Sequence, residues 1–253
     1  MTSPASSLPS DFLSTSSPNI TVEKIDFTKT PIPQYNGLKA FIIDNALSKP
    51  ECETLVQAAE ATTNGVWEQA MVNVGMGEQK LMTDVRDCGR IIWDSQTVVD
   101  AIWSRVESLV LPDMEVLKNV PKITGPGPAK RRETWKLIRP NERMRFLKYG
   151  AGQYFKPHRD GSYVTPDGSE ISFYTLHLYL NESDPSSAEG KLEGGATVFH
   201  YYDMNVEKDF KVAPKIGRIL IFQHKQLLHS GEDVTAGIKM TLRTDLMYKK
   251  VVE

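Results

Sequence analysis

The segment RFLKYGAGQYFKPHRDG covers residues Arg145–Gly161. It contains an aromatic run interrupted by glycines, and the pair His158 and Asp160 comes directly after that run. In an extended chain, side chains two positions apart leave the same face, so this imidazole and this carboxylate lie close together. Such a pair can share a metal ion. A lone His-x-Asp triplet is weak evidence, because short polar triplets also occur by chance at loop ends. The segment therefore predicts a strand that ends in a candidate pair of metal ligands.

A second histidine strengthens this interpretation. His229 comes shortly after the apolar run RILIF, which is typical of a buried strand. Two imidazoles and one carboxylate on one face of a metal leave positions open for chemistry, and this donor set favours Fe(II). A structural zinc site requires four closed ligands, usually including cysteine, and neither Cys52 nor Cys88 is near in sequence. Catalytic zinc stays open as an alternative.

The pattern of hydrophobic residues predicts a mainly β protein with flanking helices, an α+β fold. From Arg145 onward, short alternating runs are bounded by Gly, Pro, Asp or Ser, which indicates a β core over about 145–250. The preceding part, about 37–112, has helical signals. Ser48 and Glu51 have capping-box spacing, and an apolar stripe over 98–109 is followed by Pro112.

The rest of the chain organisation follows from composition. Residues 1–22 are rich in Ser, Pro and Thr and predict a disordered tail, whereas 23–253 shows no linker and predicts a single domain. Two segments rich in Gly and Pro, about 72–84 and 120–144, are expected as lid loops over a pocket.

Bulk properties exclude several partners. The net charge of -2 gives no electrostatic reason to expect nucleic acid or a membrane surface as a partner. No apolar run approaches the roughly 18 residues of a membrane span, and the start lacks the features of a signal peptide. We therefore expect a cytoplasmic protein whose two cysteines are free thiols, and the oligomeric state stays open.

Two further strands carry polar residues on one face. Lys239 and Arg243 lie at i and i+4 in IKMTLRTD, about 13 Å apart along a strand, so they should serve different anions unless both face solvent on an edge strand. Thr175, His177 and Tyr179 alternate in the same way and are expected to line a wet pocket. His177 is expected to be a core histidine bonded to a neighbour.

Five motifs, in their order and separations, resemble the catalytic domain of the prolyl 4-hydroxylase-like Fe(II)/2-oxoglutarate dioxygenases: YGAGQYFKPHRDG, TLHLYLN, GGATVF, PKIGRILIFQH and LLHSGEDVTAGIK. The resemblance covers roughly residue 37 to the end. It implies a double-stranded β-helix, a jelly-roll or cupin-like core supported by N-terminal helices. His158, Asp160 and His229 would then be the iron ligands, with Arg159 as the variable middle residue.

The resemblance also implies roles for other residues. Lys239 would hold the far carboxylate of 2-oxoglutarate, Tyr179 would donate its hydroxyl to that carboxylate, and Tyr149 would line the pocket. Arg243 departs from the family pattern. It is expected nearer the iron, where it would hold a substrate carboxylate or replace Lys239 as the anchor of 2-oxoglutarate.

The implied reaction is oxidation, chiefly hydroxylation, of a C–H bond with O2 and 2-oxoglutarate, releasing succinate and CO2, with L-ascorbate as a candidate reductant. The substrate would be an amino acid, a peptidyl residue or a small metabolite. Basic residues in or near the expected pocket and lids favour a substrate with an acidic group. For the Lys-Arg-Arg triplet, the alternative is a solvated surface loop. The basic residues concerned are Arg86, Lys130, Arg131, Arg132 and Arg243.

Two alternatives to this reaction remain. One is a non-catalytic binding module on the same barrel. The other is a zinc- or manganese-dependent hydrolase or isomerase on a cupin-like barrel. A hydrolase has no need for an inward Lys239 beside Tyr179, whereas a 2-oxoglutarate enzyme uses such a cation to hold a carboxylate. A nucleic-acid demethylase would need a basic groove, which the charge does not support.

Overall fold

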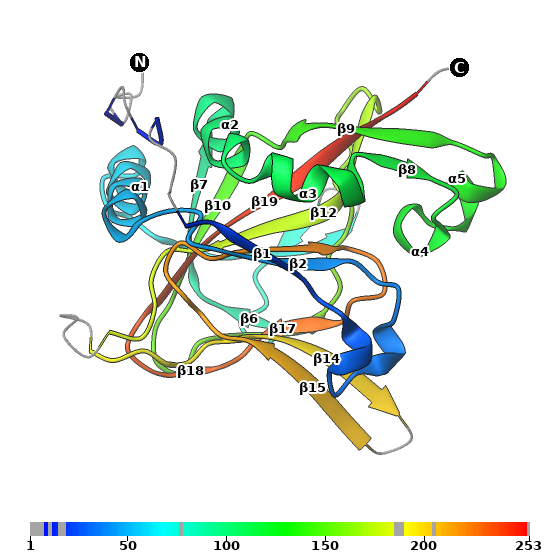
Figure 1. The fold of residues 1–253 in the computed structure, drawn as a ribbon. Helices are drawn as coiled ribbons and strands as arrows, with labels where there is room; N and C mark the ends of the chain where they lie inside the picture. Colours follow the sequence, from blue (N-terminus) through cyan, green and yellow to red (C-terminus); the bar gives the residue numbers. More distant parts are fainter. Residues whose placement is uncertain are drawn as a thin grey trace.

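The computed structural model describes residues 8–9, 12–14, 19–75, 78–184, 190–203 and 206–251. Figure 1 shows two antiparallel sheets, one above the other, with helices outside the larger one. The larger sheet has the strand order β1-β2-β16-β12-β19-β10-β7-β3, and β9 pairs with both β19 and β8. Its strands are β1 (Thr21–Lys24), β2 (Ala40–Asp44), β16 (Ile219–Gln223), β12 (Glu170–Tyr179), β19 (Lys239–Lys250), β10 (Arg143–Tyr149), β7 (Gly89–Asp94), β3 (Glu68–Gln69), β8 (Val116–Lys118) and β9 (Thr134–Pro140).

The smaller sheet has five strands in the order β15-β14-β17-β11-β6. They are β15 (Val206–Val212), β14 (Thr197–Asp203), β17 (His229–Gly231), β11 (Tyr154–His158) and β6 (Arg86–Asp87). Two short pairs complete the strands: β13 (Glu193–Gly194) with β18 (Val234–Ala236), and β4 (Val72–Gly75) with β5 (Glu78–Lys80). The mainly β class with flanking helices is therefore confirmed.

The helices lie mainly on the outer side of the larger sheet (Figure 1). They are α1 (Lys49–Thr62), α2 (Gln96–Ser104) and α3 (Glu107–Met114), with the short α4 (Pro121–Thr124) and α5 (Pro126–Lys130), and the 3-10 turns η1 (Phe27–Lys29) and η2 (Pro33–Tyr35) near the start. The predicted capping box of α1 is present, since the Ser48 backbone N–H donates to Glu51 at 2.7 Å. No helix among the described residues has both the length and the apolarity needed to cross a bilayer.

Strand alternation separates two environments on β12. Leu176 and Leu178 join the core under the helices, with Leu55 of α1 and Ile102 of α2. Tyr179 belongs instead to a second core between the sheets, together with Phe199. Period-2 alternation thus turns Thr175, His177 and Tyr179 toward the space between the sheets, as the sequence predicts. This space is where a site can form.

Several predicted boundaries differ from the structure. The apolar stripe over 98–109 is divided between two helices, since α2 ends at Ser104 and α3 begins at Glu107. Pro112 does not end the stripe's helix but lies inside α3. The segment 120–144 is not one lid loop, because α4, α5 and β9 occupy much of it and β9 pairs with β19. The segment 72–84 contains the β4–β5 pair, although residues 76–77 lie outside the described part.

The predicted tail, 1–22, also differs in its described parts. Its boundary falls inside β1, because Thr21 already pairs with Asp44 of β2. Leu13 is buried in the core under the helices, so hydrophobic contact holds this residue in place. Residues 1–7, 10–11 and 15–18 lie outside the described part of the chain.

Candidate metal centre

The structure brings His158, Asp160 and His229 together at the smaller sheet. His158 ends β11, His229 begins β17, and the two are cross-strand partners. Asp160 follows two residues after β11. One ligand atom from each residue lies within 4.8 Å of the others. The two Nε2 atoms are 3.7 and 3.8 Å from the Asp160 oxygens, beyond hydrogen-bond range and close enough for all three to hold one ion.

Backbone carbonyls orient both imidazoles. The Nδ1 atom of His158 lies 2.8 Å from the carbonyl of Lys156, and Nδ1 of His229 lies 3.2 Å from the carbonyl of Leu227. A carbonyl only accepts, so each Nδ1 carries the proton and each Nε2 presents its lone pair. Within the described residues neither Nε2 has a hydrogen-bond partner. The donor set therefore fits a divalent cation such as Fe(II).

The larger sheet holds the carboxylate. Thr175 Oγ1 of β12 donates to Asp160 Oδ2 at 2.5 Å, and Arg243 Nη2 of β19 lies 3.1 Å from Asp160 Oδ1. Burial opposes ionisation, but the Arg243 charge and the neighbouring imidazoles hold the pKa of Asp160 well below its usual value. Burial also lowers the pKa of His229 to about 3. The centre thus presents an anionic carboxylate and a neutral His229.

Lys239 is a buried cation on the same strand as Arg243. It is 3% exposed, and its Nζ lies 5.4 and 5.8 Å from the ring centres of Tyr149 and Tyr179. Among the described residues it has no hydrogen bond or ion pair. Burial lowers its pKa to about 8. Arg243, by contrast, is paired with Asp160 and Asp245. The two cations therefore differ in their surroundings: Arg243 is ion-paired, whereas Lys239 contacts two aromatic rings.

Comparison with known families gives a match over the part of the chain that contains the site. Residues 144–244 match the 2OG-Fe(II) oxygenase superfamily, and this range contains the His-Asp-His set, Lys239 and Arg243. The chain carries a 2OG-Fe(II) oxygenase domain. It is a 2-oxoglutarate-dependent dioxygenase, and the cofactors of its chemistry are Fe(II), 2-oxoglutarate and O2. No curated protein sequence matches the chain significantly.

Solved structures agree on the fold of the oxygenase. A prolyl hydroxylase from Trichoplax adhaerens, solved with a hypoxia inducible factor peptide fragment, has a TM-score of 0.53 and 18% identity, over 87% of this chain and 88% of that chain. A prolyl-4-hydroxylase from Pseudomonas putida has a TM-score of 0.50 and 13% identity, over 87% and 94% of the two chains. The fold is thus similar to that of prolyl hydroxylases.

The two tyrosines of the oxygenase have different environments. The Tyr179 hydroxyl donates to Thr197 Oγ1 at 2.7 Å, so it is already engaged. The Tyr149 side chain interacts with Cys88 and Arg86. Burial raises the pKa of both phenols, which are neutral near pH 7. Their rings flank the Lys239 ammonium, and this contact is the clearest link between the tyrosines and the site.

Several site residues were missed or misjudged from sequence. The bond from Thr175 to Asp160 depends on pairing between distant segments and has no local signal. His177 is not bonded as a core histidine, since its Nε2 is buried without a partner among the described atoms. Arg86 is buried and lies over the Phe155 ring at 4.6 Å. The triplet Lys130, Arg131 and Arg132 is exposed, which favours the solvated-loop alternative.

A second histidine cluster in the oxygenase has its bonds satisfied. His200, Glu207 and Asp209 place ligand atoms within 4.8 Å of one another. Both ring nitrogens of His200 are already hydrogen-bonded at 2.7 Å, Nδ1 to Asp209 and Nε2 to Ser230. The centre at Asp160 differs, because its two Nε2 atoms face the carboxylate without a bond. That difference makes it the candidate metal centre.

Proposed function

We propose that the protein hydroxylates a C–H bond of an amino acid, a peptidyl residue or a small metabolite, with His158, Asp160 and His229 as the Fe(II) ligands. The observation that carries the proposal is the unpaired Lys239 ammonium on β19. A His-Asp-His set alone suits several metals. A buried cation without an anion is costly unless a ligand supplies the negative charge, and 2-oxoglutarate brings a second carboxylate.

Each residue then has a definite task. Iron held by the three ligands would supply the oxidative decarboxylation of 2-oxoglutarate and the oxidant for the C–H bond. Lys239 binds the far carboxylate, while Tyr149 and Tyr179 shape the pocket around it. Arg243 and Thr175 fix the Asp160 carboxylate. Because Arg243 is already paired with two carboxylates, Lys239 is the better anchor for 2-oxoglutarate.

The two facing sheets are consistent with a double-stranded β-helix core, with residues 23–253 as one domain. In such a jelly roll, ligands bind between the sheets, where the inner faces of β12 and β19 carry the polar side chains. The substrate is a peptide or a small molecule. The Trichoplax enzyme was solved with a peptide fragment, which supports a peptidyl substrate as one member of this class.

An anaerobic titration tests the proposal without knowledge of the substrate. Fe(II) and then 2-oxoglutarate are added to metal-free protein, and the visible charge-transfer band of the chelated keto acid is recorded. We expect a band in the wild type and in His200→Ala, and none in His158→Ala. His200 is the matched control because it is a histidine of the same sheet outside the proposed ligand set.

The alternatives give different results in the same experiment. Iron binding without a band would favour a zinc or manganese hydrolase on this barrel. Absence of iron binding would favour a non-catalytic binding module. A band that survives in His158→Ala would contradict the assigned ligands.

A further inference from the structure

A cavity of about 530 Å³ lies beside the candidate metal centre. Its wall includes Asp160 itself, next to Arg159, and Lys225 with His224 from the turn after β16. Pro121 and Gly125, at the two ends of α4, close another side. Since Asp160 is both a proposed ligand and a wall residue, a molecule in this cavity would lie next to the metal.

Two cations of this wall have no partner. Arg159 and Lys225 are exposed, and neither side chain has a hydrogen bond or ion pair with the described residues. Asp160 is the one carboxylate among the described wall residues, and Thr175 and Arg243 already bind it. The wall therefore has an excess of positive charge, and the metal adds to it.

His224 adds an unsatisfied polar group. The residue is 1% exposed, and neither of its ring nitrogens has a hydrogen-bond partner among the described atoms. The closest carboxylate is Asp245, with Oδ1 at 3.5 Å from Nε2, which is long for a hydrogen bond. Because both nitrogens are buried from solvent and Asp245 lies beside one of them, this imidazole could meet a ligand in the cavity only if its side chain moved.

We propose that this cavity is the substrate site and that it binds an oxyanion of the substrate, a carboxylate or a phosphate, through Arg159 and Lys225. The proposal rests on the proposed function, because it takes Asp160 to be a metal ligand. It makes Arg159, the residue between the two ligands of the His-x-Asp motif, a determinant of specificity. A neutral substrate would leave both cations unpaired.

The site can be tested with small anions in place of the unknown substrate. Trifluoroacetate serves as the carboxylate probe, neutral trifluoroacetamide as its isostere, and methylphosphonate as the phosphate probe. Binding to metal-free protein is measured from 19F and 31P line widths. The measurement is repeated with Mn(II) and saturating 2-oxoglutarate, where paramagnetic relaxation reports closeness to the metal.

We expect trifluoroacetate or methylphosphonate to bind and to be relaxed by Mn(II), and trifluoroacetamide to do neither. Stronger relaxation of trifluoroacetate would indicate a substrate carboxylate, and stronger relaxation of methylphosphonate a substrate phosphate. Arg159→Gln and Lys225→Gln should each weaken binding by about threefold, as for an exposed charge pair, and the double variant should weaken it further. Arg159→Lys should keep most of the binding. Lys249→Gln, the same change at an exposed lysine outside the cavity, should have no effect.

Two outcomes would overturn the inference: equal binding of the anion and the amide, or equal anion relaxation in the wild type and the double variant. Failure of the proposed function is seen separately. Mn(II) that relaxes water equally in wild type and His158→Ala would refute the metal centre. Anion binding to the metal-free protein would still report on the cavity, provided that it is weaker in the double variant, because the anion could also bind at Lys239.

Discussion

Arg243 and Asp160 join the two sheets at the candidate metal centre, with Nη2 of the arginine 3.1 Å from Oδ1 of the aspartate. Arg243 belongs to β19 of the larger sheet, whereas Asp160 follows β11 of the smaller one. Thr175 of β12 makes the second link. The imidazoles therefore come from one sheet and the groups that fix the carboxylate from the other. The centre forms only when both sheets are in place.

Loss of the anionic ligand should abolish turnover. Asp160→Ala removes the carboxylate and leaves Arg243 without its closest partner, so we expect a fall in 2-oxoglutarate consumption beyond the roughly 10–100-fold typical of outer contacts. Succinate release is the measurement. Asp209→Ala, in the satisfied cluster at His200, is the control and should keep activity. Unchanged turnover in Asp160→Ala would refute the ligand set.

The hydroxyl of Thr175 should matter for iron more than for folding. Thr175→Val keeps the shape but removes the bond to Asp160 Oδ2, and we expect iron binding to weaken by about 10–100-fold. The dissociation constant of Fe(II) is measured anaerobically, with thermal unfolding of the metal-free protein as the control. Equal iron affinity in both proteins would show that the bond does not orient the ligand.

Lys239 and Arg243 should differ in their effect on the cosubstrate. Lys239→Ala should raise the 2-oxoglutarate concentration at half-maximal charge-transfer absorbance far more than it changes iron binding, because it removes an unpaired cation. Arg243→Ala should chiefly weaken iron binding, because it releases Asp160. The reverse pattern would make Arg243 the anchor.

Binding of 2-oxoglutarate should weaken at alkaline pH. The pKa of Lys239 is lowered to about 8 by burial, and a bound carboxylate would raise it again. Between these two values binding takes up a proton, so affinity falls as pH rises, by at most about tenfold per pH unit. Titrations from pH 7 to 9.5 measure this effect. Lys239→Arg should stay flat, because the guanidinium remains charged; the same slope in that variant would assign the effect to another group.

The three candidate metal ligands could be picked out from the sequence because each stands next to a recognisable strand. His158 and Asp160 are two residues apart at the end of a strand, and His229 follows a clear apolar strand. Period-2 alternation also gave the inward face of β12. Both the i, i+2 spacing and the alternation of side chains follow from the geometry of a single strand, so they can be read from the sequence without knowledge of contacts between distant segments.

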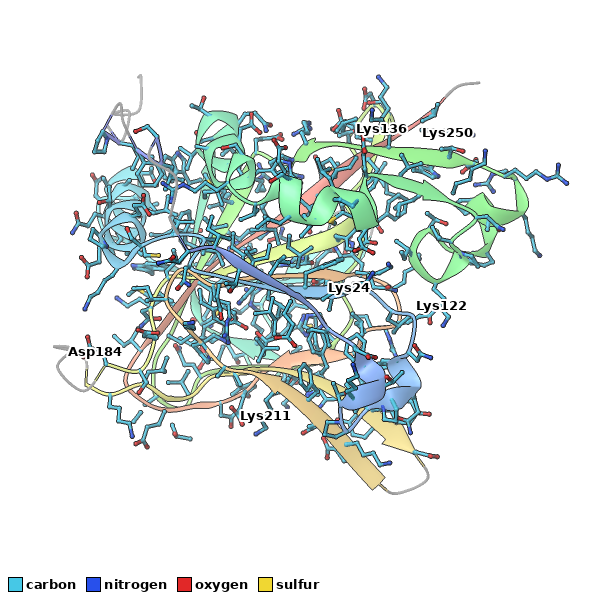
Figure 2. The ribbon with its side chains drawn as sticks, viewed as in Figure 1. Lys24, Lys122, Lys136, Asp184, Lys211 and Lys250 are labelled. Carbon is cyan, nitrogen blue, oxygen red and sulfur yellow. The ribbon has the colours of Figure 1, made fainter. Side chains whose placement is uncertain are left out.

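Other features depend on contacts between distant segments. The lid expected over 120–144 contains β9, which is fixed by pairing with β19 rather than by its glycines and prolines. Thr175 reaches Asp160 only across the two sheets. Charge alone did not separate the buried Arg86 from the exposed Arg132, because burial is decided by packing. Lys136 and Lys250, labelled at the upper edge of Figure 2, are exposed, whereas Lys239 is buried.

The three residues of β17 make the centre sensitive to insertions. His229 faces the candidate metal, while Ser230, the next residue, turns to the opposite face and binds His200. A slip of β17 by one position against Phe199 of β14 would exchange these two faces. A hydroxyl would then replace the imidazole beside Asp160. A single added residue between Gln226 and Leu228 could therefore remove the metal centre without any change in composition around it.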